Sequence, residues 1–356
     1  MDKKGKFCLD LNLEDIKLWC KEKNLPSFRA GQLYKWLSSG VINTDEMTNI
    51  PKNMRDEINK DFITDGMKIE HEFISQIDGT VKLVFGLYDG HIIETVLMRY
   101  KTGISICISS QAGCKMGCTF CASAHAGFGR SLTGGEMLGQ VLLSQKHIGE
   151  RIRSVVVMGI GEPFDNYDNL MDFINLVTDE NGNNLGSRHI TVSTCGLVPE
   201  MKKFTEQNLQ VNLSVSLHAP YQVLREKLMP IARRYDINEL IKACSEYEKT
   251  TNRRITFEYS LFAGVNDTKE CAAELHKLLR GIHCHINLIA ANEFPGSPYK
   301  RSPAGNVAEF QKYLEGYHMN ATLRREMGTD IMAACGQLRR GLESEANKPK
   351  DGDIES

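Results

Sequence analysis

The sequence predicts an α/β fold, with a small helical domain at the N-terminus and a short antiparallel β extension before the main body. Two patterns carry this prediction. Short β-rich runs alternate with helical runs from about residue 104 onward, and apolar residues alternate with a period of two between about residues 67 and 103. Regular alternation of strands and helices favours a parallel sheet, either a barrel or an open doubly wound sheet.

The composition is that of a globular protein. The chain has 356 residues, of which 41% are hydrophobic and 25% charged, and it has a net charge of −2. No run of about 18 uncharged apolar residues is present, which argues against a membrane protein. The N-terminal residues lack the apolar stretch of a secretion signal, so we expect a cytoplasmic protein with reduced cysteines. Its eleven cysteines therefore indicate metal or thiol chemistry.

Residues 1–66 are expected to form a helical accessory domain. Asn12 and Ser27 are typical N-cap residues in front of helical apolar patterns, and a third helix is expected after Pro51. Basic and acidic residues balance in this part of the chain. We therefore interpret it as a structural domain.

Residues 67–103 are expected to form the β extension, since Asp78-Gly79 and Asp89-Gly90 suit hairpin turns. The core follows over 104–342, with a polar tail over 343–356. Its expected strands are 104–109, 154–159, 190–194, 211–217, 255–261 and 285–289, with a further strand beginning at Ala321. Helices are expected over 137–148, 170–177, 237–247, 272–279 and 307–317.

The strongest motif is the run GCKMGCTFCAS, in which Cys114, Cys118 and Cys121 have C-x3-C-x2-C spacing. A structural zinc site is the rival interpretation, but it needs four ligands and no fourth Cys or His stands at a suitable spacing. Three thiolates on a four-iron cluster leave one iron open to a substrate. With Phe120 before the last cysteine, the segment resembles the radical S-adenosylmethionine (SAM) signature.

Polar residues follow nearly every predicted core strand. Ligands of parallel α/β barrels gather at the carboxyl ends of the strands, so we expect these residues to bind SAM. Each alone is more typical of a turn or a cap, but together they place polar groups on the side of the three cysteines. The expected SAM-binding residues are Gly161, Glu162, Ser193, Ser216, Leu217, His218 and Asn292.

Further motifs resemble the RlmN/Cfr family of radical-SAM RNA methyltransferases over roughly residues 12–340. The resemblance implies a partial (β/α)6 TIM-like barrel with one 4Fe-4S cluster, held by the three cysteines and an exchangeable SAM. Pro163 and the run FPGSPY are closer to the RlmN branch, which methylates adenine C2, than to the Cfr branch, which methylates C8. The motifs are CISSQAGCKMGCTFC, MGIGEPFDNYDN, HITVSTCG, VSLHAP, FPGSPY and DIMAACGQL.

The resemblance also implies three catalytic residues. Cys335 would carry the methyl group, Cys107 would resolve the intermediate, and Glu94 would accept a proton. The remaining cysteines are interpreted as structural. They are Cys8, Cys20, Cys195, Cys244, Cys271 and Cys284.

A radical route suits the implied reaction because adenine C2 has no nucleophilic character. By resemblance, two SAM molecules are used in each turnover. The first methylates Cys335, and the second yields a 5′-deoxyadenosyl radical that removes hydrogen from this methyl group. The carbon radical adds to C2, and Cys107 then attacks the sulfur of Cys335, which releases 2-methyladenosine and leaves a Cys107–Cys335 disulfide.

The implied substrates are adenosine 2503 of 23S rRNA and adenosine 37 of some tRNAs. The target base must be unstacked for C2 to be reached. A flavodoxin or ferredoxin-like protein is the implied electron donor, and we expect a monomer without membrane association. The alternatives are a Cfr-like C8 methyltransferase, a radical-SAM enzyme of another reaction type, and a zinc-stabilised RNA-binding protein without catalysis.

Overall fold

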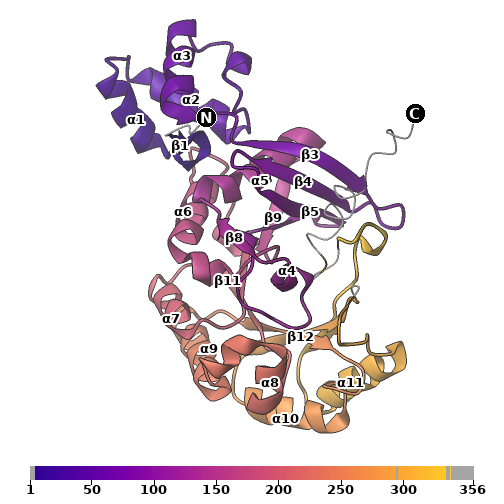
Figure 1. Cartoon of the computed structure of the whole chain (residues 1–356). Coiled ribbons are helices and arrows are strands. Elements are labelled where there is room, and N and C mark those ends of the chain that lie inside the picture. Colours follow the sequence, from indigo (N-terminus) through magenta and orange to yellow (C-terminus); the bar gives the residue numbers. More distant parts are fainter. Residues whose placement is uncertain (1–4, 294–295, 334–336, 338–356) are drawn as a thin grey trace, which may run out of the picture.

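The computed structural model describes residues 5–293, 296–333 and 337, and its centre is one ten-stranded sheet. The strand order is β14-β13-β12-β11-β10-β9-β6-β5-β4-β3. The small helical domain lies beside one end of this sheet, and the remaining helices pack along its length (Figure 1). None of the helices within the described residues combines the length and the apolar character needed to cross a membrane.

The parallel part of the sheet confirms the α/β prediction. From β6 to β14 all neighbouring strands are parallel. Successive strands are neighbours and the order never reverses, as it would in a doubly wound sheet. The strand order therefore selects the partial barrel. These strands are β6 (Gly103–Ile108), β9 (Ile152–Val157), β10 (Ile190–Thr194), β11 (Asn212–Ser216), β12 (Ile255–Leu261), β13 (Cys284–Ala290) and β14 (Ala321–Leu323).

Helices connect these strands, as the alternating pattern predicts. The first, α5, begins with a capping box in which Thr133 and Glu136 satisfy each other's backbone N–H groups, and it ends at Gly149 with φ of 67°. The helices are α5 (Gly134–Ile148), α6 (Tyr167–Thr178), α7 (Val198–Glu206), α8 (Gln222–Leu228), α9 (Ile237–Thr251), α10 (Lys269–Leu279) and α11 (Ala304–Gly316). Helices α7 and α8 were not among the expected ones.

The N-terminal region contains α1 (Leu13–Glu22), α2 (Phe28–Ser38) and α3 (Lys52–Asp61). Asn12 caps α1 as predicted, because its side chain accepts a hydrogen bond from the backbone N–H of the third helical residue. Ser27 does not cap α2, and this expectation is wrong. Its backbone is already helical and its side chain makes no capping bond. Two short parallel strands, β1 (Lys6–Phe7) and β2 (Phe62–Ile63), join the ends of this region.

The antiparallel extension consists of β3 (Met67–Ile74), β4 (Val81–Leu87) and β5 (Ile92–Tyr100). Both expected Asp-Gly turns are present, with positive φ at each glycine. Strand β5 also pairs antiparallel with β6, so the extension and the barrel share one sheet. This pairing places Val96 directly opposite Cys107. A separate two-stranded ribbon, β7 (Gln111–Gly113) and β8 (Phe128–Ser131), flanks the cysteine motif.

Candidate active site

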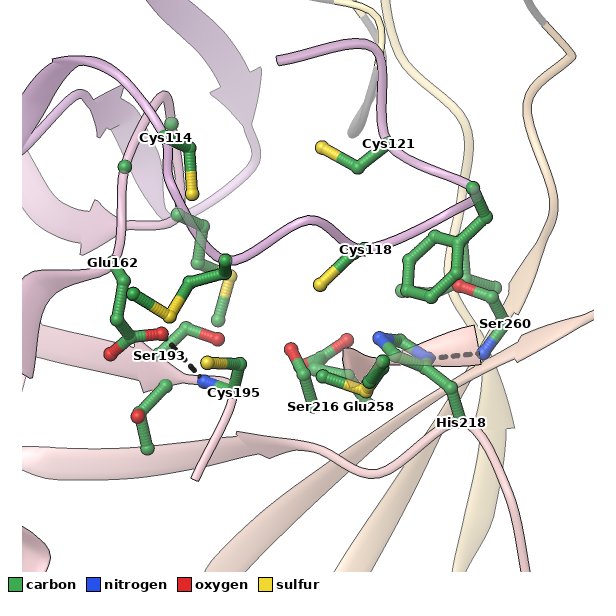
Figure 2. A pocket seen from close by; sticks show the side chains of 18 of the residues that line it. Cys114, Cys118, Cys121, Glu162, Ser193, Cys195, Ser216, His218, Glu258 and Ser260 are labelled. Carbon is green, nitrogen blue, oxygen red and sulfur yellow. Dashed lines mark hydrogen bonds between the residues drawn. The ribbon is translucent and has the colours of Figure 1, made fainter. Parts of the chain in front are cut away.

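A cavity of about 170 Å³ opens at the carboxyl ends of the parallel strands. Its wall combines the cysteine motif with residues that follow β9, β10, β11, β12 and β13. Figure 2 shows the labelled thiols, carboxylates, hydroxyls and imidazole around this one space. The cavity therefore lies at the edge of the sheet where ligands of parallel α/β barrels gather.

The three cysteines of the motif all line the cavity, and their sulfurs lie around it rather than at a single point (Figure 2). They belong to the loop between β7 and the short helix α4 (Ala122–His125). Burial raises the pKa of Cys114 to about 12 and also raises the pKa of Cys118. Thiols in this environment are protonated near neutral pH, so binding of metal would release protons from them.

Phe120 anchors this loop against the barrel. Its ring packs on the edge of His218, with ring centroids 4.8 Å apart, and on Phe262, at 5.3 Å. The backbone N–H of the preceding Thr119 donates a hydrogen bond to the carbonyl of Leu228, the last residue of helix α8. An aromatic residue at this place therefore fixes the position of the two cysteines that flank it.

Glu162 and Gly161 form one side of the cavity. The Glu162 carboxylate accepts hydrogen bonds from the backbone N–H groups of Phe164, at 3.0 Å, and Cys195, at 2.7 Å. Burial raises the pKa of Glu162, although these bonds oppose the shift. Gly161 has φ of 112°, and a β-carbon there would lie 2.7 Å from Ser110 and Gln111. Glycine is therefore required at this position.

Ser193, Ser216 and His218 line the cavity at the ends of their strands. The Nδ1 atom of His218 accepts a hydrogen bond from the backbone N–H of Ser260, at 2.9 Å. Burial lowers the pKa of His218 to about 3, so the imidazole is neutral and Nε2 carries its proton. Its backbone has φ of 54°, in the left-handed region.

Asn292 lines the cavity as well, but Leu217 does not. Leu217 is fully buried, and its backbone N–H bonds the carbonyl of Glu258. It lies between two residues that line the cavity, Ser216 and His218, and its side chain belongs to the hydrophobic core.

Strand β12 contributes two residues that the sequence analysis missed. Glu258 and Ser260 line the cavity, and the Glu258 carboxylate accepts hydrogen bonds from Ser214 Oγ and Asn287 Nδ2, both at 2.8 Å. Burial raises the pKa of Glu258. The sequence did contain a signal for these two residues: Glu258 and Ser260 stand two positions apart in a largely apolar strand, so their side chains share one face. Cys195, interpreted as structural, also lines the cavity.

Cys107 lies in a second, smaller cavity of about 40 Å³. The two cavities share three residues of their walls, Ile289, Asn292 and Arg324. Cys107 is only 5% exposed, on the face of β6 that packs against Val96. The site of the expected resolving thiol therefore adjoins the site of the three cysteines.

Glu94 is buried in strand β5 rather than solvated at a strand end. It forms an ion pair with Lys82, with 3.5 Å between Oε1 and Nζ, and both side chains are at most 5% exposed. Glu94 lines neither cavity. It lies two residues before Val96, so the two side chains share one face of β5, and Val96 is paired with Cys107 on β6.

Cys335, the expected methyl carrier, lies outside the described residues. Ala333, the last residue described before it, lines the Cys107 cavity. It packs in one hydrophobic cluster with Cys107, Val96 and Met98. The described chain therefore approaches Cys335 from the wall of the second cavity.

Comparison with known proteins follows the same division of the chain. Residues 108–278 match the family model of the radical SAM superfamily, and residues 8–63 match that of the ribosomal RNA large subunit methyltransferase N-terminal domain. The second model thus covers most of the N-terminal helical region.

Two curated relatives are similar to almost the whole chain. The probable dual-specificity RNA methyltransferase RlmN of Clostridium novyi is 48% identical over 94% of this chain and 98% of its own length. The protein of the same name from Clostridium tetani is 50% identical over 93% of this chain and 95% of its own. A crystal structure of a radical SAM methyltransferase from Sphaerobacter thermophilus superposes with a TM-score of 0.91, with 41% identity, and covers 94% of this chain and 99% of that one.

Proposed function

The chain belongs to the RlmN family of radical-SAM RNA methyltransferases, and on this basis we propose that it methylates C2 of adenosine 2503 in 23S rRNA and of adenosine 37 in some tRNAs. The single observation that carries the proposal is the adjacency of the two cavities. One holds three cysteines and polar strand-end groups, the other holds Cys107, and they share a wall. We place this reaction in the cytoplasm.

The first cavity fits a 4Fe-4S cluster with SAM. Cys114, Cys118 and Cys121 surround one space, as ligands of separate iron atoms would, whereas ligands of one zinc ion converge on one point. When bound, the cluster supplies the electron that cleaves SAM. Glu162 offers a buried carboxylate to the ammonium group of SAM, and Ser193, Ser216, His218 and Asn292 complete the polar wall.

The second cavity suits the thiol chemistry. Cys335 as a thiolate takes the methyl group of a first SAM and presents this carbon to adenine C2. After this carbon has lost one hydrogen atom and bonded to C2, the adduct gives up one electron, and Glu94 takes the proton that C2 loses. Cys107 as a thiolate then attacks the Cys335 sulfur and forms the disulfide. The bond from sulfur to the product carbon breaks, and this carbon takes up a proton to become the methyl group. Two electrons from a thiol or a flavodoxin- or ferredoxin-like donor must reduce this disulfide before the next turnover.

Chain connectivity supports the pairing of these two thiols. Ala333 packs against Cys107 in the described structure, and Cys335 follows Ala333 by two residues. Two peptide units span at most about 7 Å. A separation this short is compatible with the proposed disulfide between Cys107 and Cys335.

Mass spectrometry of RNA tests the proposed activity. We expect 23S rRNA and tRNA from a strain lacking the gene to lose 2-methyladenosine and to regain it with the cloned gene. An 8-methyladenosine product would instead assign the chain to the Cfr branch. Unmodified RNA together with a colourless, zinc-containing protein would support the RNA-binding alternative.

Substitution of the two thiols separates their roles. We expect Cys107→Ala to accumulate a covalent protein–RNA adduct, because the product carbon stays on Cys335 when no thiol can release it. Cys335→Ala should form no adduct, because it cannot carry the methyl group. Denaturing gels of anaerobic reactions with labelled RNA measure this directly, and Cys271→Ala, a cysteine on α10 remote from both cavities, is the matched control. Adducts in both variants, or in neither, would contradict the assigned roles.

A further inference from the structure

Arg225 lies behind the wall of the first cavity and is completely buried, with 0% of its surface exposed. It projects from α8, and its Nη2 atom donates hydrogen bonds to the carbonyls of Cys195, at 2.6 Å, and Ser216, at 3.3 Å. Both of these residues line the cavity. The guanidinium is therefore one layer away from the space that the three cysteines surround.

The positive charge of Arg225 has no acidic partner within the described part of the chain. Among the described residues, no carboxylate forms an ion pair or a hydrogen bond with this guanidinium, and its Nε and Nη1 atoms are buried without a hydrogen-bond partner. A buried charge without a countercharge is strongly unfavourable. A bound anion that is not one of the described residues would remove this penalty.

Arg225 interacts electrostatically with the thiols of Cys195, Cys118 and Cys244, and also with the imidazole of His218. Cys118 is a member of the C-x3-C-x2-C motif, and it lines the same cavity as Cys195 and Ser216, whose carbonyls accept hydrogen bonds from Arg225. As a cluster ligand it is a thiolate. Loading of the cluster would thus place negative charge beside the unpaired guanidinium.

We infer that Arg225 is the buried countercharge of the iron–sulfur cluster, acting through Cys118 and raising the reduction potential of the cluster. The inference rests on the proposed function, in which Cys118 is a ligand. Charge and burial around a cluster set its potential, and a fixed cation in a medium of low dielectric constant favours the state with one more electron. Because Arg225 does not line the cavity and acts through the residues in front of it, it is a positioning residue.

A redox titration of the full-length, anaerobically reconstituted protein tests this role. We expect Arg225→Met to lower the ratio of reduced to oxidised cluster at a fixed applied potential by at least tenfold, which is about 59 mV for a one-electron couple. Arg225→Lys keeps the charge and should stay within a few-fold of the native chain. Arg151→Met is the control. This arginine directly precedes β9, at the strand end opposite the cavity, and it also donates hydrogen bonds to two backbone carbonyls, those of Asn183 and Asn184.

A native potential in Arg225→Met with full iron content would overturn the inference, as would an equal shift in Arg225→Lys. If Arg225→Met does not fold, Arg225→Gln is used in its place, because glutamine keeps an amide donor for the Cys195 carbonyl. In either variant, loading of the cluster should raise the melting temperature by less than it does in the native chain. A rise as large as that of the native chain would contradict the inference. Failure of the proposed function is separate: the native chain would then bind no cluster, or would bind one and leave RNA unmethylated.

Discussion

At the scale of single residues, buried carboxylates lie both at the first cavity and in the antiparallel extension. Glu162 and Glu258 lie at the first cavity, where backbone or side-chain donors hold their carboxylates. Glu94 and Lys82 lie in the antiparallel extension and pair with each other. Breaking a buried ion pair is costly, because the partner that remains keeps its desolvation penalty.

Substitution of Lys82 should therefore destabilise the protein through Glu94. The Lys82 ammonium also lies over the ring of Phe73, 5.0 Å from its centroid. We expect Lys82→Met to lower the free energy of unfolding by about 3 to 5 kcal/mol. The double variant with Glu94→Gln should recover part of this loss, since the buried carboxylate is then gone. Urea unfolding of the four proteins in this double-mutant cycle gives the coupling energy, and additive effects would show that the pair does not interact.

At the scale of elements, a polar network ties the β4–β5 turn to β8 and to the first turn of α5. Arg130 on β8 bonds Asp89 in the turn and pairs with both carboxylate oxygens of Glu136, at 2.7 Å each. Burial alone would raise the pKa of Asp89, but the hydrogen bonds from Arg130 and from the backbone of His91 bring it down to about 2. The network thus connects the extension with the segment that follows the cysteine motif.

This shift predicts how stability depends on pH. The folded pKa of Asp89 lies below its ordinary value of 3.8, so its contribution is complete above about pH 5 and is lost as the pH falls toward 2. Since the side chain is partly exposed, we expect Asp89→Asn to lower the free energy of unfolding by about 1 to 2 kcal/mol at pH 7. Melting temperatures between pH 7 and pH 3 should show this gap narrowing below about pH 4. A gap of constant size would contradict the role of the charge, and Asp45→Asn, on the exposed surface, is the control.

At the scale of the whole molecule, the sequence predicts most strands because each is a short apolar run between turn residues. The sequence pattern does not determine the order of those strands in the sheet, because strands and helices alternate along the chain in both a barrel and a doubly wound sheet. The polar strand ends identified most of the cavity wall. Glu258 and Arg225 were missed because their roles depend on which strands and helices become neighbours. Leu217 was assigned to the wall, yet its side chain packs in the core between two residues that line the cavity.

The hydrogen-bonded pairing of β5 with β6 makes the extension and the barrel one continuous sheet within the described chain. A hinge between them would have to break the whole row of bonds from Val96 to Tyr100. Access for a large nucleic acid must therefore come from movement of the loops at the carboxyl edge, or from distortion of the RNA. The sheet itself acts as a rigid platform, so the adjustment falls on those loops and on the RNA.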